Sequence, residues 1–175
     1  MVNIKFNSEK ALEAILYVAS KAPIPDIYHV IKALYFADLK HLDRYGRLIT
    51  GDKYIAMRYG PVASGALDIV NLAKGKQAFL PAGISIDTIL NSVDVVGKNI
   101  NAIRRYRESA FSESDIECLD EAISEIGGLD FDTICQKSHG SAWESADENG
   151  EISFSELAKE SDPSGLLLKY LGCGA

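Results

Sequence analysis

Residues 32–62 read KALYFADLKHLDRYGRLITGDKYIAMRYGPV, and this stretch decides the fold. Its first half continues a helix that Asp26 can cap, because apolar residues recur at three- and four-residue intervals along one helical face. Gly46 can adopt the left-handed conformation that often ends a helix. A strand-like run follows over residues 53–58. The stretch therefore predicts a long helix that ends near Tyr45, then a glycine turn and a short strand.

Polar and aromatic side chains are crowded into the same stretch. Tyr35 and Asp38 stand at positions i and i+3, with Leu42 at i+7, so the three share the inward face of the predicted helix. Buried polar groups need hydrogen-bond partners, so we expect a network that ties this helix to residues 51–60. Gly60 can take the positive φ angle of a turn between the strand and the next element.

The remainder of the chain shows mostly helical spacing. The predicted helices cover residues 62–74 (opened by Pro61), 112–126 (with a capping box of Ser112 and Asp115), 130–145 and 153–160, after a first helix that Asn7 or Ser8 caps and Pro23 ends. Residues 91–96 and 101–107 read as two strands around a turn at Gly97. The sequence thus predicts an α+β fold, predominantly α-helical, with about six helices and a small antiparallel β element.

The composition is that of a globular, acidic protein. Of 175 residues, 47% are hydrophobic and 25% are charged, and the net charge is −7. Nucleic-acid affinity depends on clustered Lys and Arg, so we expect no nucleic-acid partner. No apolar stretch approaches the ~18 residues of a membrane span, and the first residues lack the apolar core of a signal peptide. These features predict no membrane partner and a cytoplasmic location.

Residues that could carry catalysis or hold a metal are scattered. The three cysteines are Cys118, Cys135 and Cys173. Their odd number and wide spacing predict free thiols. The three histidines are His29, His41 and His139, and none lies in a metal-binding motif. Residues 145–156 have the polar spacing of a calcium-binding loop, but Ser145 stands where the first carboxylate is needed. We therefore interpret the segment as a polar turn before a capped helix. We therefore expect no metal, no cofactor and no catalytic residue.

The densest basic run is Arg104-Arg105-Tyr106-Arg107. Arginines interleaved with an aromatic residue occur in single-stranded nucleic-acid sites. In an acidic chain without a second basic cluster, we interpret the run as a solvated strand surface or a patch for an acidic protein partner.

The motifs LYFAD, YG and ITGDKYIAMRYGPV, with a histidine between the first two, resemble the Panacea domain, also called SocA-like after a bacterial antitoxin. The resemblance continues through the capped helix at Ser112 and through His139 and Trp143. It covers roughly residues 8–160. We therefore expect a Panacea domain over residues 1–160 and a C-terminal helical tail over 161–175.

This resemblance implies an antitoxin of a toxin–antitoxin pair, often encoded on phages or mobile elements. Family members commonly neutralise a cognate toxin by direct binding, and the alternative is an adaptor that delivers the toxin to a cytosolic protease. The family supplies no catalytic residue. A hypothesis of another class is an enzyme with an unrecognised hydrolytic or metal site around His41 and His139.

We divide the signature residues between fold and partner. The residues expected to hold the fold are Tyr35, Asp38, His41, Tyr45, Gly46, Gly51, Asp52, Gly60, Pro61, His139 and Trp143. The residues expected to contact a partner are Tyr54, Arg58, Tyr59, Arg104, Arg105 and Arg107. The second assignment rests on the dominance of Tyr and Arg at interface hot spots.

Overall fold

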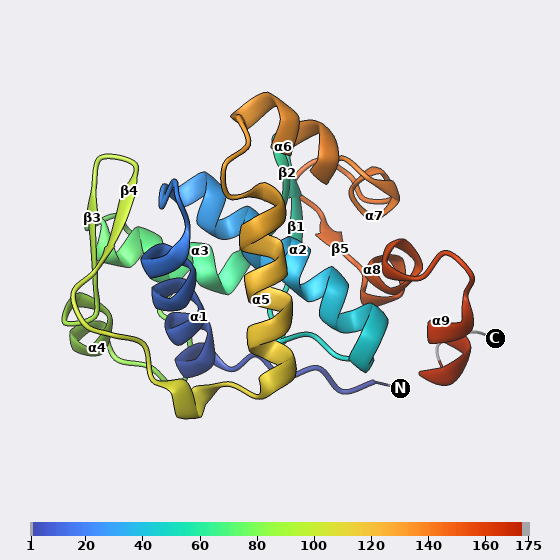
Figure 1. Cartoon of the computed structure of the whole chain (residues 1–175), viewed down its shortest axis with the longest axis horizontal. Coiled ribbons are helices and arrows are strands. Elements are labelled where there is room, and N and C mark those ends of the chain that lie inside the picture. The colour runs from blue at the N-terminus through green and yellow to red at the C-terminus, as the bar shows by residue number, and fades with distance from the viewer. Residues whose placement is uncertain (1, 173–175) are drawn as a thin grey trace.

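The computed structural model describes residues 2–172 as a predominantly helical α+β fold (Figure 1). Within this range there are nine α-helices, six of them with seven or more residues, and two small antiparallel sheets. The elements are α1 (Ser8–Lys21), α2 (Ile27–Tyr45), β1 (Tyr54–Met57), β2 (Gly60–Ala63), α3 (Ser64–Ala73), α4 (Ile86–Leu90), β3 (Val93–Val96), β4 (Asn99–Ala102), a 3-10 helix (Glu108–Ala110), α5 (Glu113–Ile126), α6 (Phe131–Ser138), α7 (Ser141–Glu144), β5 (Glu151–Ile152), α8 (Phe154–Ser161) and α9 (Leu166–Tyr170). The predicted fold class is confirmed.

Helix α2 is the centre of the molecule. It packs most extensively against α5, which crosses in front of it in Figure 1, and it also contacts α1, α8 and β2. Apolar side chains of all these elements are buried in one continuous core. Burial of this apolar surface is the main force that holds the helices together.

Local capping signals place the helix ends where the sequence predicts them. The side chain of Asn7 accepts a hydrogen bond from the backbone of α1, and that of Asp26 from the backbone of α2. Gly46 ends α2 at a φ angle of 69°. Ser112 and Asp115 form a reciprocal capping box at the start of α5.

The prediction that Pro61 opens a helix is wrong. Residues 60–63 form strand β2, which pairs antiparallel with β1, and α3 begins only at Ser64. The preceding residue is an alanine, which offers no side-chain cap. The carboxylate of Asp52 takes this place, because it accepts from the backbone nitrogens of Gly65 at 2.8 Å and Ala66 at 2.9 Å.

Three further elements differ from the prediction. The helix expected over 130–145 is divided into α6 and α7, and a one-turn helix, α4, was not predicted. The β3–β4 hairpin exists, but β4 ends at Ala102, so Arg104 and Arg107 do not lie on a strand. They reach instead to the buried carboxylate of Glu13.

Residues 145–156, which resemble a calcium-binding loop in sequence, form part of the β-sheet and the turn before it. Asn149 N donates to Ala56 O at 2.7 Å, and Ala56 N donates to Gly150 O at 2.9 Å. These bonds lead into β5, a two-residue strand that pairs with the free edge of β1. Strand β1 is therefore the middle strand of a three-stranded sheet in the order β2–β1–β5.

The last described helix, α9, packs against α8 with Leu167 buried. The division of the chain at residue 160 stays a prediction. Cys118 is buried and Cys135 is half-buried, each as a free thiol, whereas Cys173 lies outside the described residues. Among residues 2–172, no helix has the length and apolar character needed to cross a membrane.

The carboxylate of Asp115 joins α1, α5 and the segment after α2. Its oxygens lie 2.6 Å from Lys10 Nζ, 3.1 Å from Arg47 Nη2 and 3.4 Å from His41 Nε2. Burial raises the pKa of Asp115, but hydrogen bonds from Lys10 and from the backbone of Ser112, with the charges of Lys10 and Arg47, hold it below its usual value.

Asp115→Asn is expected to lower the free energy of unfolding by about 2–3 kcal/mol at pH 7, since the half-buried Lys10 loses its charged partner and the buried carboxylate is removed. A carboxylate with a depressed folded pKa stabilises fully above its unfolded pKa, about 3.9, and loses that contribution as the pH falls through the folded pKa. The difference between wild type and variant should therefore shrink toward pH 3.

Urea unfolding of both proteins at pH 7, 5 and 3 measures this difference. The wild type must be compared with the variant at each pH, because Asp38 changes the free energy of unfolding with pH in the opposite direction to Asp115. Burial raises the pKa of Asp38 to about 6, against the hydrogen bonds from Tyr54 and Ile49, so its protonation favours the folded state as the pH falls. A difference between wild type and Asp115→Asn that stays constant with pH contradicts the role of Asp115.

Candidate functional site

A cavity lies between the first turns of α2, the β1–β2 turn and the start of α6. We call it the α2 pocket, and its volume is about 670 Å³. This is within the ordinary range of binding pockets, about 300–1,000 Å³. Its apolar lining includes Ile27, Tyr28, Ile31, Val62, Leu67 and Phe131. The pocket could therefore bury a sizeable apolar group.

A buried lysine forms part of the wall of the α2 pocket. Lys32 is 1% exposed, and its Nζ donates to Pro61 O at 2.6 Å and lies 5.3 Å from the centre of the Tyr28 ring. Among the described residues it forms no ion pair with a carboxylate. Burial lowers the pKa of Lys32 to about 7, and the nearby Cys135 only partly offsets this.

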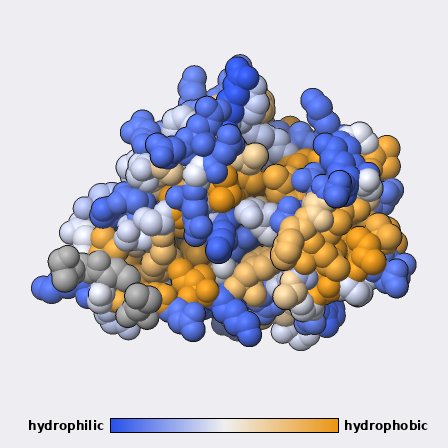
Figure 2. All heavy atoms as spheres, turned by 180° about the vertical axis from the view of Figure 1, so that it is seen from behind, coloured by the Kyte–Doolittle hydropathy of each residue, from blue (hydrophilic) through white to orange (hydrophobic). Residues whose placement is uncertain are grey.

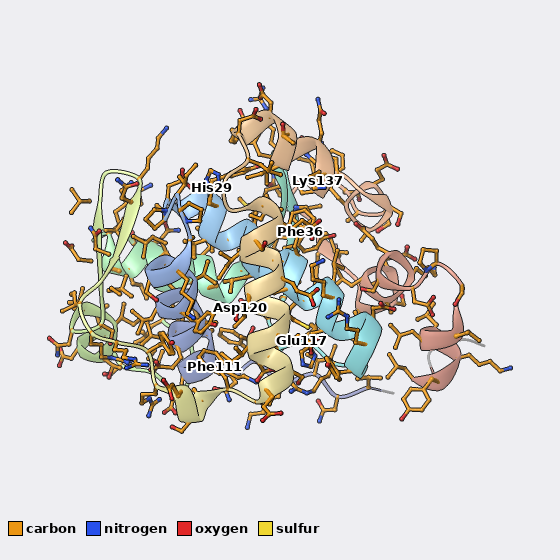
Figure 3. The ribbon with its side chains drawn as sticks, in the orientation of Figure 1. His29, Phe36, Phe111, Glu117, Asp120 and Lys137 are labelled. Atoms are coloured by element: carbon orange, nitrogen blue, oxygen red, sulfur yellow. The ribbon has the colours of Figure 1, made fainter. Side chains whose placement is uncertain are left out.

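Two more cations surround the opening of the α2 pocket. Arg58 lies over the ring of Tyr59 at 5.3 Å, and Lys98 projects from the β3–β4 turn. Neither has an acidic partner within residues 2–172. The one carboxylate in the lining, Asp26, already binds the backbone nitrogen and Nδ1 of His29, each at 2.8 Å. His29 is labelled near the start of α2 in Figure 3.

Large apolar side chains are exposed at this opening. Met57 is 37% exposed, Phe131 is 41% exposed and Tyr59 is 47% exposed. Tyr59 and Phe131 meet edge to face, with ring centroids 5.1 Å apart. Phe131 also packs on Tyr28, at 4.5 Å. An aromatic cluster thus connects the interior of the α2 pocket with the molecular surface.

The structure separates the residues expected to contact a partner. Arg58 and Tyr59 line the α2 pocket. Tyr54 does not, and its expected contact role is corrected: the side chain is 1% exposed, and its hydroxyl donates to Asp38 Oδ2 at 2.6 Å. Asp38 also accepts from Ile49 N at 2.6 Å, so the network ties α2 to β1 inside the core.

The basic run forms a different surface. Arg104 and Arg107 surround Glu13, and they line with Arg105 a second, more polar cavity of about 650 Å³. The nearest Arg104–Glu13 distance is 2.6 Å. These arginines do not converge with Arg58, so the six expected contact residues belong to at least two separate places.

The two histidines of the enzyme hypothesis also lie apart. His41 binds Arg47 O and Ser114 Oγ, each at 2.9 Å, inside the core. His139 stacks on Trp143 with ring centroids 3.8 Å apart, and Trp143 Nε1 donates to Met57 O at 2.8 Å. Within residues 2–172 no group of three potential ligands is arranged to hold a metal.

Other signature residues have surface or turn positions. Tyr45 donates to Glu117 Oε2 at 2.6 Å, and Glu117 is labelled on α5 in Figure 3. Gly51 has a φ angle of 71°, and a side chain there would meet the backbone of Lys5. These contacts connect α2 and the segment after it to neighbouring parts of the fold.

Exposed apolar side chains also occur in α4, in the β3–β4 hairpin and in the loops beside them. They are Phe79, Leu80, Ile86, Leu90, Val96 and Ile103. Figure 2 shows hydrophobic surface gathered on the side where α3, α4 and the β3–β4 hairpin lie. Phe79 is 75% exposed, but nothing in the described residues indicates what would cover these side chains.

Sequence reasoning missed Tyr28, Lys32, Lys98 and Phe131 as members of one site. The available signal was Lys32, a charged residue within the buried run of α2, one turn after Tyr28. Lys98 and Phe131 arrive from distant parts of the chain, and no local pattern connects them with α2.

Comparison with known proteins gives one match. A family model described as "Antitoxin SocA-like, Panacea domain" matches residues 30–144, about two thirds of the chain. No curated protein matches the chain, and no solved structure does.

Proposed function

Because the chain belongs to the family of SocA-like antitoxins with a Panacea domain, we propose that it neutralises a cognate toxin by binding it directly. The observation that carries this proposal beyond the family is the exposed aromatic cluster at the α2 pocket. Protein interfaces are enriched in Tyr, Phe, Met and Arg, with depletion of other charged residues at their centre. Tyr59, Phe131, Met57 and Arg58 provide this set within one surface.

The arrangement of titratable groups supports binding more than catalysis. An active site brings a nucleophile or metal together with a base and an orienting group. His41 and His139 instead have separate partners in the fold. The buried cation of the α2 pocket, Lys32, donates to the backbone carbonyl of Pro61. Among the described residues, no carboxylate forms an ion pair with it.

The proposal predicts stoichiometric protection. When the gene beside the one for this chain is expressed alone, growth should stop, and increasing amounts of this chain should restore it up to a fixed ratio. The two proteins should also purify together. Titration of growth against the measured ratio, with size-exclusion chromatography of the mixture, tests both.

The same titration separates the alternatives. An enzyme would protect at substoichiometric amounts and leave the toxin chemically altered, which intact-mass spectrometry detects. An adaptor would lower the toxin level only in cells that contain the protease. Either outcome contradicts neutralisation by direct masking.

A further inference from the structure

We propose that the α2 pocket is the docking site for a segment of the partner protein in which an aromatic or branched aliphatic side chain stands beside an acidic residue. This inference rests on the proposed function, because it assigns the place and the chemistry of the toxin contact.

The apolar part of the segment is required by the interior of the pocket. The walls from α2, β2 and α3 are aliphatic, and Tyr28 and Phe131 close one side with their rings 4.5 Å apart. A volume of about 670 Å³ accepts a large side chain together with its backbone. A polar occupant would lose its hydration there without enough hydrogen-bond partners.

The acidic part is required by the three cations. Lys32, Arg58 and Lys98 all line the pocket, and none forms an ion pair among the described residues, although the chain has a net charge of −7. Most other basic residues of the described chain form an ion pair with a carboxylate, as Arg104 does with Glu13 and Lys10 does with Asp115. A buried ammonium without a counter-charge is costly, so a carboxylate brought by the partner would stabilise Lys32 in its charged form.

A protein segment fits better than a small molecule. A small ligand inside the pocket would leave Met57, Tyr59 and Phe131 exposed at the opening, each at more than one third of its surface. A protein would cover these side chains while its anchor residue fills the pocket. Arg58 and Lys98 lie at the opening of the pocket. This position suits contact with an acidic residue of a peptide that remains outside, and it suits a fully enclosed small ligand less well.

The chemistry can be tested before the toxin is known. We would select a random peptide library displayed on phage against the whole chain, and measure binding of the enriched peptides by fluorescence polarisation. Enriched peptides should share an aromatic or aliphatic residue next to Asp or Glu. Replacement of that acidic residue by its amide should weaken binding about 10-fold, and added salt should weaken it as well.

Variants then locate the site. Arg58→Glu with Lys98→Glu should weaken binding of the acidic peptides at least about 10-fold. Lys53→Glu with Lys76→Glu makes the same change of charge at exposed positions away from the pocket and should leave binding unchanged. Tyr59→Ala tests the apolar contact, and Lys32→Met removes the buried charge while it retains most of the volume. Thermal melting of each variant shows whether it is folded.

The outcomes separate this inference from the proposed function. Enriched peptides without an acidic residue, equal binding by both double variants, or saturation of the pocket by phenylacetate alone with no peptide enriched would each overturn the inference. If the Arg58→Glu/Lys98→Glu variant still protects fully against a toxin that binds the wild type, the docking site is wrong and the antitoxin function stands. If the wild type neither binds nor protects, the proposed function fails.

Discussion

Gly60→Val is expected to lower the free energy of unfolding by about 3–5 kcal/mol, the sum of backbone strain and overpacking. Gly60 has a φ angle of 106°, which a β-branched residue resists. A Cβ atom there would also overlap Ser138 Oγ and lie 2.9 Å from Lys32 Nζ. Neither neighbour has free space, since both Ser138 and Lys32 are buried.

Gly97→Val is the matched control for this variant. Gly97 has a φ angle of 64° in the β3–β4 turn, but nothing lies within 4 Å of the position of its Cβ. In Gly97→Val, only backbone strain should therefore lower the free energy of unfolding, by about 1–2 kcal/mol. Urea unfolding followed by circular dichroism measures both losses. If both variants lower the free energy of unfolding equally, the close approach of Gly60 to Ser138 and Lys32 does not contribute to stability.

Glu13→Ala is expected to lower the free energy of unfolding by about 2–4 kcal/mol, because it removes a carboxylate that accepts charge-assisted hydrogen bonds from Arg104 and from the backbone of Arg107. The Glu13 side chain is fully buried. Its oxygens accept from Arg104 Nη2 at 2.6 Å and from the backbone nitrogen of Arg107 at 2.7 Å. Burial raises the pKa of Glu13, but the hydrogen bonds from Arg104 and Arg107, with the charge of Arg104, hold it below the usual value.

Arg105→Ala is the control for the Glu13 prediction. Arg105 belongs to the same run, but its side chain is 74% exposed, and its ion pair among the described residues is with the similarly exposed Glu108. Exposed pairs contribute little, so its unfolding midpoint should match that of the wild type. If Glu13→Ala is as stable as Arg105→Ala, the link from α1 to the loop after β4 does not hold the fold.

Local chemistry explains which parts of the fold could be predicted. Asn7, Asp26 and Ser112 cap helices through hydrogen bonds three residues away, and such signals are complete within a short window. The start of α3 depends on Asp52, whose carboxylate bonds Gly65 thirteen residues later. No short window contains that interaction, so the sequence placed the helix too early.

The candidate site shows the same division between local and distant information. Residue type within a single run predicts Arg58 and Tyr59 as contact residues, and both line the α2 pocket. The same reasoning predicts Tyr54, but alternation along β1 directs it into the core. Lys98 and Phe131 join the pocket only because the β3–β4 turn and α6 fold back onto α2. Residue type indicates interface chemistry, and only the tertiary fold decides which side chains meet.

The order β2–β1–β5 has a consequence for synthesis on the ribosome. Tyr54 of β1 pairs with Ile152 of β5, so the partner of one edge of β1 is translated nearly one hundred residues later. At about 5–20 residues per second, the nascent chain exposes that edge for roughly 5–20 s. During this interval the incomplete sheet is a target for chaperones and a route to aggregation.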